Sequence, residues 1–119
     1  MNDKVNLAEA FAQISEAYSP RIVARMNDYK IVVVKPMGEF VWHTHPDTDD
    51  FFLVVKGSLT VKLRDRDVDL SAGELFVVPA GVEHCPVAEE EAEVLLIEPL
   101  GTPNTGDAGG EKTVDEREQ

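Results

Sequence analysis

Residues 38–57 read GEFVWHTHPDTDDFFLVVKG, and this stretch decides both the fold and the candidate site. His43 and His45 are two positions apart, so on a β-strand both imidazoles lie on one face. A Pro-Asp-Thr turn follows, then Asp49 and Asp50, and then an apolar run that ends at a glycine. The stretch therefore predicts two neighbouring strands with two imidazoles on the first and a carboxylate at the start of the second.

A second stretch, residues 73–84, reads GELFVVPAGVEH and ends on the third histidine, His84. Two imidazoles on one strand, a carboxylate opening the next and a later imidazole can together form one metal site. Imidazole and carboxylate ligands suit Fe, Mn, Ni, Co or Zn, and geometry selects among these metals. We expect one divalent metal ion, and the alternative is a metal-free domain whose histidines are ordinary polar residues.

The two stretches resemble the two motifs of the cupin superfamily, in its small single-domain form. The residues that carry the first motif are Gly38, His43, His45, Asp50 and Gly57. The residues that carry the second motif are Gly73, Pro79, Gly81 and His84. With the strands around them, the motifs cover roughly residues 30–98. The resemblance implies an all-β fold, an antiparallel double-stranded β-helix or jelly-roll barrel. It also implies one divalent metal held by three histidines and a carboxylate, and frequent dimerisation.

By this resemblance the metal ligands are His43, His45, His84 and Asp50. The carboxylate position of the family is usually Glu, whereas this chain has Asp there. Asp49 fits a looser form of the motif, but counting back from the glycine at the end of the strand favours Asp50. Because Asp is one methylene shorter than Glu, the alternatives of Asp50, Asp49 or a water as fourth ligand stay open at this point.

The rest of the chain is expected to form the structural framework around the candidate site. An apolar stripe predicts a short amphipathic helix over residues 6–18. Short apolar runs separated by turn residues follow, which is typical of an all-β sandwich or barrel. The expected division is an N-terminal helix and arm at 1–20, one barrel domain at 21–100 and a mobile acidic tail at 101–119.

Composition limits the possible partners and compartments. A chain of 119 residues is enough for one domain, and its net charge of −12 opposes binding to nucleic acid or to an anionic membrane. The single cysteine excludes an internal disulfide, and neither a secretory signal nor a long apolar run is visible, so we expect a cytoplasmic protein. Residues 31–34 and 51–55 are apolar on both faces, which predicts a homodimer.

These observations predict a metal-binding cupin that acts on or binds a small molecule inside the barrel. Oxygenase, isomerase and decarboxylase chemistry all remain open, because a fold does not define a reaction. The motif stretches are poor in Arg and Lys, which argues against a phosphosugar substrate and favours an uncharged or apolar one. The competing hypothesis is a non-catalytic module that binds a small ligand or senses a metal.

Overall fold

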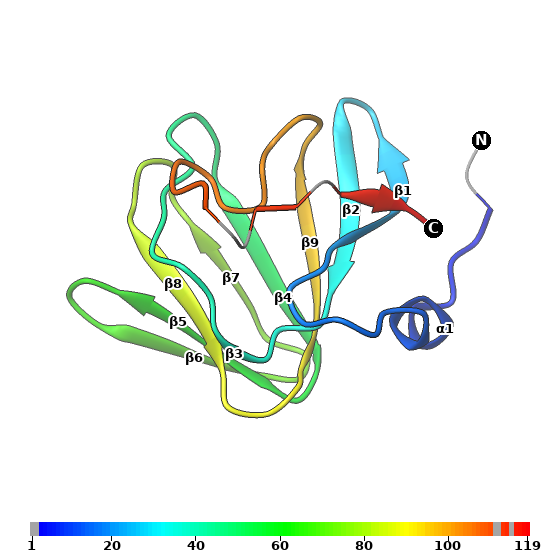
Figure 1. Ribbon diagram of the computed structural model, residues 1–119, viewed down its shortest axis with the longest axis horizontal. Coiled ribbons are helices and arrows are strands. Elements are labelled where there is room, and N and C mark those ends of the chain that lie inside the picture. Colours follow the sequence, from blue (N-terminus) through cyan, green and yellow to red (C-terminus); the bar gives the residue numbers. More distant parts are fainter. Residues whose placement is uncertain (1–2, 111–112, 115) are drawn as a thin grey trace.

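The computed structural model describes residues 3–110, 113–114 and 116–119, and two β-sheets facing each other form its body (Figure 1). The larger sheet has the order β10-β1-β2-β9-β4-β7, and the smaller has the order β3-β8-β5-β6. Neighbouring strands are antiparallel except for the pair β1 and β10. With one short helix beside these sheets, the predicted all-β, antiparallel cupin-like fold is confirmed.

The elements are short and follow one another closely. The helix is α1 (Leu7–Ala12). The strands of the larger sheet are β1 (Arg21–Met26), β2 (Tyr29–Val34), β4 (Asp50–Lys56), β7 (Leu75–Val78), β9 (Glu93–Pro99) and β10 (Arg117–Glu118). The strands of the smaller sheet are β3 (Gly38–Glu39), β5 (Ser58–Leu63), β6 (Asp67–Ser71) and β8 (His84–Ala88).

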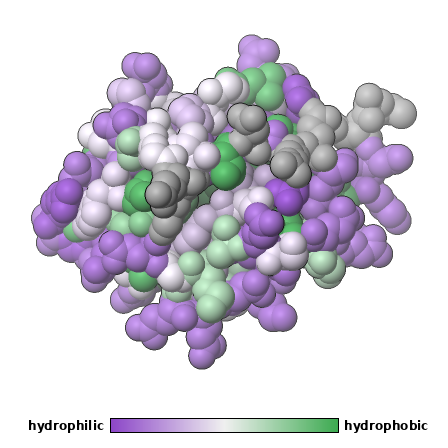
Figure 2. Space-filling view, in the orientation of Figure 1, coloured by the Kyte–Doolittle hydropathy of each residue, from purple (hydrophilic) through white to green (hydrophobic). Residues whose placement is uncertain are grey.

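The main core lies between the sheets and is built from alternate positions of the strands. The larger sheet contributes Val34, Phe52, Val54, Val78 and Val94, and the smaller contributes Leu59, Val61, Leu70 and Ala88. Figure 2 shows hydrophilic residues over most of the outline of one face, with paler and hydrophobic residues toward its middle. The core holds the two sheets at a fixed spacing, and the site lies at one end of the space between them.

The helix is shorter than the sequence predicts. It begins after Asn6, whose side chain accepts a hydrogen bond from the Glu9 backbone N–H, and it ends at Ala12. Beyond it, two further turn bonds follow, and the segment is then held by Lys35, the residue after β2. The Lys35 ammonium donates to the Ile14 carbonyl at 3.0 Å, and the Tyr18 N–H donates to the Lys35 carbonyl at 3.1 Å. The apolar face of the helix still packs, with Phe11 fully buried against the outer face of the larger sheet.

The histidine strand is also less regular than predicted. Only Gly38–Glu39 forms a strand, and His43 pairs with His84 as an isolated bridge. The reason lies on β8 at Pro86, which accepts a hydrogen bond from the Phe40 N–H but has no N–H to return. The ladder therefore breaks between Glu39 and His43, and the chain reaches the site as a loop held at the bridge.

The C-terminal segment after β9 lies along one side of the domain, where the sequence predicted a mobile tail. Of its described residues, Thr105 is fully buried, and the Asp107 N–H donates to the Thr44 carbonyl at 2.9 Å. The strand β10 adds to the edge of the larger sheet beside β1. These contacts bring residues far from the motifs to the site, while the mobility of the segment stays a prediction. Within the described residues, no helix has both the length and the apolar character that crossing a membrane requires.

Candidate metal centre

Four side chains from three separate parts of the chain meet between the sheets. His43 and His45 come from the loop after β3, Asp50 opens β4, and His84 opens β8. One nitrogen or oxygen atom from each lies within 4.8 Å of the others, and all four residues are buried. The structure therefore brings together every residue that the sequence predicts as a metal ligand.

Backbone carbonyls fix the orientation of two of the imidazoles. His43 Nδ1 lies 2.8 Å from the Val41 carbonyl oxygen, and His84 Nδ1 lies 2.9 Å from the Val82 carbonyl oxygen. A carbonyl can only accept, so in both rings Nδ1 carries the proton and Nε2 of the neutral ring presents a lone pair. A hydrogen bond from Nδ1 to a backbone carbonyl is the usual arrangement for a histidine that binds a metal through Nε2.

The carboxylate of Asp50 faces the Nε2 atoms of two of the imidazoles, His84 and His45. Its Oδ2 lies 2.9 Å from His84 Nε2 and 3.3 Å from His45 Nε2. A carboxylate oxygen and the Nε2 of a neutral His84 are both acceptors, so the contact is repulsive unless a proton or a cation lies between them. Two ligand atoms about 2.1 Å from one ion and at right angles to each other lie about 3 Å apart. The donor set thus fits a divalent metal in both chemistry and spacing.

The protonation states of His43 and Asp50 suit metal binding. Burial, the largest influence, lowers the pKa of His43 to about 4, so this imidazole is neutral at pH 7. Burial acts to raise the pKa of Asp50, but the hydrogen bonds and charges of His45 and His84 outweigh it and lower that pKa to about 2. A neutral imidazole and an ionised carboxylate are the forms that bind metals, so little proton competition is expected from these two groups near neutral pH.

Asp49 has a different environment from its neighbour Asp50. It is exposed, and its Oδ1 accepts a hydrogen bond from the Ala80 backbone N–H at 2.9 Å. That bond ties the start of β4 to the turn before His84. Asp50 is buried at the centre of the group. The geometry therefore favours Asp50 as the ligand and gives Asp49 a role in holding the turn.

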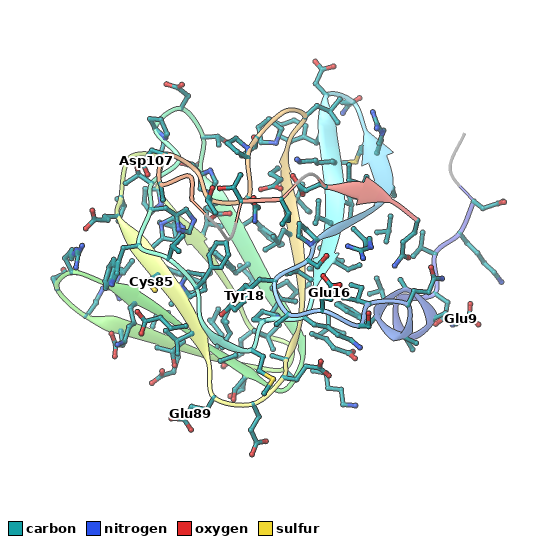
Figure 3. All side chains as sticks on the ribbon, in the orientation of Figure 1. Glu9, Glu16, Tyr18, Cys85, Glu89 and Asp107 are labelled. Carbon is teal, nitrogen blue, oxygen red and sulfur yellow. The ribbon has the colours of Figure 1, made fainter. Side chains whose placement is uncertain are left out.

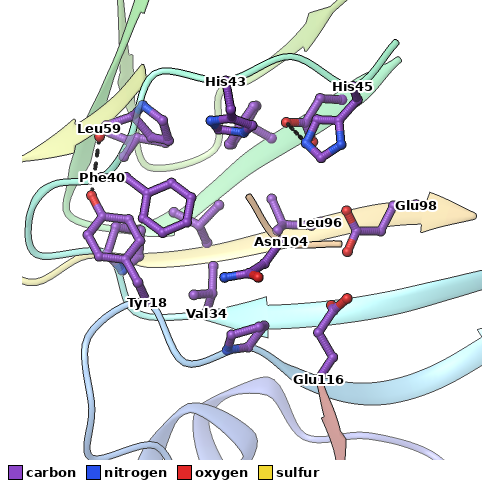
Figure 4. A pocket seen from close by; sticks show the side chains of 16 residues that line it. Tyr18, Val34, Phe40, His43, His45, Leu59, Leu96, Glu98, Asn104 and Glu116 are labelled. Atoms are coloured by element: carbon purple, nitrogen blue, oxygen red, sulfur yellow. Dashed lines mark hydrogen bonds and ion pairs between the residues drawn. The ribbon is translucent and has the colours of Figure 1, made fainter. Parts of the chain in front are cut away.

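A cavity opens beside the metal group. Its empty space, counted together with the open solvent at its mouth, is about 530 Å³. Its apolar lining consists mainly of Val34, Phe40, Phe52, Leu59, Val94 and Leu96. Figure 4 shows His43 and His45 on one side of this space, with Glu98 and Glu116 facing it from another. Among the described residues that line it, none is Arg or Lys, which agrees with the expectation of an uncharged or apolar ligand.

Sequence reasoning missed the polar residues on the far side of the cavity, including Tyr18, Glu98, Asn104 and Glu116. One signal was available for Glu98. It follows the apolar run of β9, and its register partner on β2 is Lys30, which precedes a similar apolar run. Opposite charges at paired positions of two buried strands indicate a buried ion pair. No comparable signal marks Glu116, which reaches the cavity only through the path of the C-terminal segment.

The C-terminal segment is fastened to the histidine loop at one point. Asp107 Oδ1 accepts a hydrogen bond from the Thr44 N–H at 2.7 Å, and Figure 3 labels Asp107 on this segment. Gly106 has a left-handed φ of 54°. A Cβ placed there would lie 2.1 Å from the Thr44 carbonyl oxygen and 3.1 Å from His43 Cδ2. Only glycine permits so close an approach, so this residue sets how the segment lies against the metal group.

The environment of Glu98 predicts a dependence of stability on pH. Burial first, and the adjacent Glu116 next, raise the pKa of Glu98 from 4.5 to about 9, while Lys30 acts to lower it and Asp50 to raise it. A carboxyl whose pKa rises on folding contributes its full stability below its unfolded pKa and loses that contribution as pH rises toward the folded value. Stability is therefore lost between about pH 4.5 and pH 9.

We expect Glu98→Gln, which imitates the protonated carboxyl, to remove this loss. Its thermal midpoint should match that of the unsubstituted protein near pH 5 and exceed it by about 5 °C at pH 9. Thermal unfolding followed by circular dichroism across this range measures the difference. The exposed Glu89→Gln serves as a control that should show no such trend. A difference that is the same at every pH would contradict the prediction.

Comparison with known proteins agrees with the geometry. A family model described as a cupin domain matches residues 30–98. A cupin-2 domain containing protein from Shewanella frigidimarina has a crystal structure that is 47% identical. The match covers 80% of this chain and 93% of that chain, with a TM-score of 0.79. A protein from Neisseria meningitidis is 33% identical over 82% of this chain and 99% of its own, with a TM-score of 0.75.

The curated relatives include proteins that carry the name of an enzyme. The 3-hydroxyanthranilate 3,4-dioxygenase of Mycosarcoma maydis is 30% identical over 89 residues, which cover 67% of this chain and 49% of the dioxygenase. The chain thus spans about half the length of that relative.

Proposed function

Because the chain belongs to the cupin-domain family, we propose that it binds a small, largely apolar molecule at one divalent metal ion. The proposed ligands of the ion are His43, His45, Asp50 and His84. The observation that carries the proposal is the contact between Asp50 Oδ2 and His84 Nε2. Because His84 Nδ1 is bonded to the Val82 carbonyl, an approach of 2.9 Å in a buried site needs a proton or a cation between the two atoms, and a divalent metal ion meets this need.

The reaction class that we propose is oxygenase-type chemistry. A bound divalent metal supplies Lewis acidity or a site for O₂. The residues of this chain hold the ligand between apolar walls, exclude water and keep the imidazoles in the tautomer that binds metal. The 30% identity to a dioxygenase supports this choice, and the lack of Arg and Lys on the described cavity wall argues against a phosphorylated substrate.

An experiment in two steps tests the function. Protein purified without an affinity tag is first analysed for metal, and we expect close to one equivalent of a first-row divalent ion. The metal-loaded protein is then screened for O₂ uptake with small diphenols and aminophenols, including 3-hydroxyanthranilate. Uptake that depends on compound and metal supports oxygenase chemistry. Binding of these compounds without uptake would favour the second candidate, a non-catalytic ligand-binding or metal-sensing cupin.

The two adjacent aspartates give a sharp test of the ligand set. We expect Asp50→Asn to weaken Co²⁺ binding by about tenfold or more, because it removes the only carboxylate of the group and its charge compensation. Asp49→Asn should change the affinity by no more than about twofold, since an exposed carboxylate contributes screened electrostatics. Isothermal titration with Co²⁺ measures both. Equal losses in the two variants would show that the turn, rather than Asp50 itself, supports the site.

We also propose a homodimer, formed through the outer face of β4 and β7. Phe51 pairs in register with Val77, and Leu53 with Leu75, so the four apolar side chains share that face. Leu75 is 56% exposed and Val77 is 40% exposed at an edge strand, which is costly for a monomer. The helix α1 covers a different part of the sheet, around Val33.

Sedimentation should show a dimer at micromolar concentration, and Leu75→Asp together with Val77→Asp should convert it to a monomer. The exposed pair Glu89→Gln and Glu90→Gln provides a matched double substitution outside this face. A monomer in the unsubstituted protein would refute the dimer. The cytoplasmic location expected from the sequence also remains part of this proposal.

A further inference from the structure

A second polar cluster borders the cavity, away from the metal group. It consists of Lys30 on β2, Glu98 on β9 and Glu116 on the C-terminal segment. The side chains of these three residues are 4%, 5% and 6% exposed. Figure 4 shows the carboxylates of Glu98 and Glu116 turned toward each other at the edge of the cavity. Ionisable side chains are rarely fully buried unless they are paired, so three buried ones at one wall form an organised polar site rather than a solvated surface.

The cation of this cluster has its hydrogen bonds made within the protein. Lys30 Nζ donates to Glu116 Oε1 and to the Thr102 carbonyl at 3.0 Å, and it lies 3.5 Å from Glu98 Oε1. An ammonium has three donors, of which two are used in these hydrogen bonds, and the group also lies in ion-pair range of Glu98. The ammonium of Lys30 is therefore engaged by acceptors of the protein and is not available to bind an anionic ligand.

One acceptor of the cluster has no partner. Glu116 Oε2 is buried without a hydrogen bond, although the other oxygen of the same carboxylate accepts from Lys30. A buried acceptor without a hydrogen bond destabilises the folded state, and such atoms are rare in native structures. Glu98 and Glu116 both line the cavity. The unpartnered oxygen is therefore placed where a group of a bound molecule can donate to it.

We propose that Glu98 and Glu116 recognise a hydrogen-bond donor, a hydroxyl or an amino group, on the end of the ligand opposite its metal-binding end. The ligand class is then a small molecule with a coordinating oxygen or nitrogen at one end, an apolar body and a donor at the other. This inference rests on the proposed function, because the metal fixes the first end. Glu116 arrives on the C-terminal segment, so the recognition site is complete only when that segment is docked.

The substitution Glu116→Gln is a sharp test. An amide can keep an acceptor toward Lys30, but it then presents an N–H₂ donor where Glu116 Oε2 stood. The side chain keeps its shape, but the atom at the cavity changes from a hydrogen-bond acceptor to a donor. Exposed Glu89→Gln is the matched control. Hydrogen exchange at the Thr44 N–H, which donates to Asp107, reports whether the segment stays docked in the variant.

The probes are benzoate and 4-hydroxybenzoate, which differ only in the donor, and titration calorimetry on Co²⁺-loaded protein measures their affinities. We expect 4-hydroxybenzoate to bind at least about tenfold more tightly than benzoate, because a hydrogen bond to a charged group is a strong one. In Glu116→Gln this preference should fall below about twofold with benzoate affinity unchanged, and in Glu89→Gln it should persist.

The possible outcomes distinguish failure of the donor site from failure of the metal site. Equal binding of the two probes, binding of neither, or a preference that persists in Glu116→Gln overturns the donor site and leaves the metal site standing. Loss of benzoate affinity together with lost protection at Thr44 shows that Glu116 acts by docking the segment, which also overturns direct recognition. Protein that takes up no Co²⁺ overturns both the proposed function and this inference.

Discussion

Replacing His84 with alanine should lower the affinity for Co²⁺ by more than about 100-fold, because loss of a direct ligand exceeds the usual 10–100-fold effect of an outer partner. His84 Nε2 lies against Asp50 Oδ2, and its ring is held by the Val82 carbonyl, so no nearby group can take its place. Without this imidazole, the group that the structure brings together loses one nitrogen and its only ligand from the smaller sheet.

The matched control is the neighbouring residue on the same strand. Cys85 is also fully buried but does not belong to the four-residue group, so Cys85→Ala should leave Co²⁺ affinity unchanged within about twofold. Circular dichroism of the metal-free variants shows whether both remain folded. Similar Co²⁺ affinity in folded His84→Ala and in the unsubstituted protein would remove His84 from the ligand set.

Replacing Gly106 with alanine should detach the C-terminal segment from the histidine loop. The added Cβ would lie 2.1 Å from the Thr44 carbonyl oxygen, an approach that no side chain tolerates. We expect amide exchange at Thr44 to accelerate by at least about tenfold, since its N–H donates to Asp107 on the segment that must move. Moving this segment also displaces Glu116 from the cavity wall.

Gly109→Ala is a closely matched control. Gly109 has a φ of 62°, near the 54° of Gly106, so alanine meets the same left-handed strain of about 1–2 kcal/mol at both positions. At Gly109, however, the added Cβ has no atom within 4 Å. Equal exchange at Thr44 in the two variants would show that strain rather than the close contact matters. The exchange rate in the unsubstituted protein also tests the predicted mobility of residues 101–119.

The parts of the protein that the sequence predicts are those governed by local pattern. Alternation and turn residues indicate the all-β fold, because each strand must turn one face toward the core. The two motifs select the four residues of the metal group, and the structure places them within 4.8 Å. The choice of Asp50 over Asp49 follows from position on the strand, since Asp50 points inward with Phe52 and Val54.

The parts that the sequence could not predict depend on contacts between distant segments. The break in the histidine strand follows from Pro86, a residue of the partner strand. The segment that follows the short helix is held by Lys35, a residue far along the chain. The segment after β9 is polar and acidic, which is typical of disorder, yet Gly106 permits a backbone contact that brings Glu116 to the cavity.

One divalent metal ion, bound by three histidines and an aspartate, is the feature on which the proposed function depends. The most direct test is a crystal structure of protein purified without added metal, with anomalous diffraction collected on both sides of the absorption edge of the metal found by elemental analysis. We expect a single strong anomalous peak about 2.0–2.2 Å from Nε2 of His43, His45 and His84, with a carboxylate oxygen of Asp50 at a similar distance. An ordered site with no anomalous peak, in protein that had also been soaked with Co²⁺, would contradict this expectation.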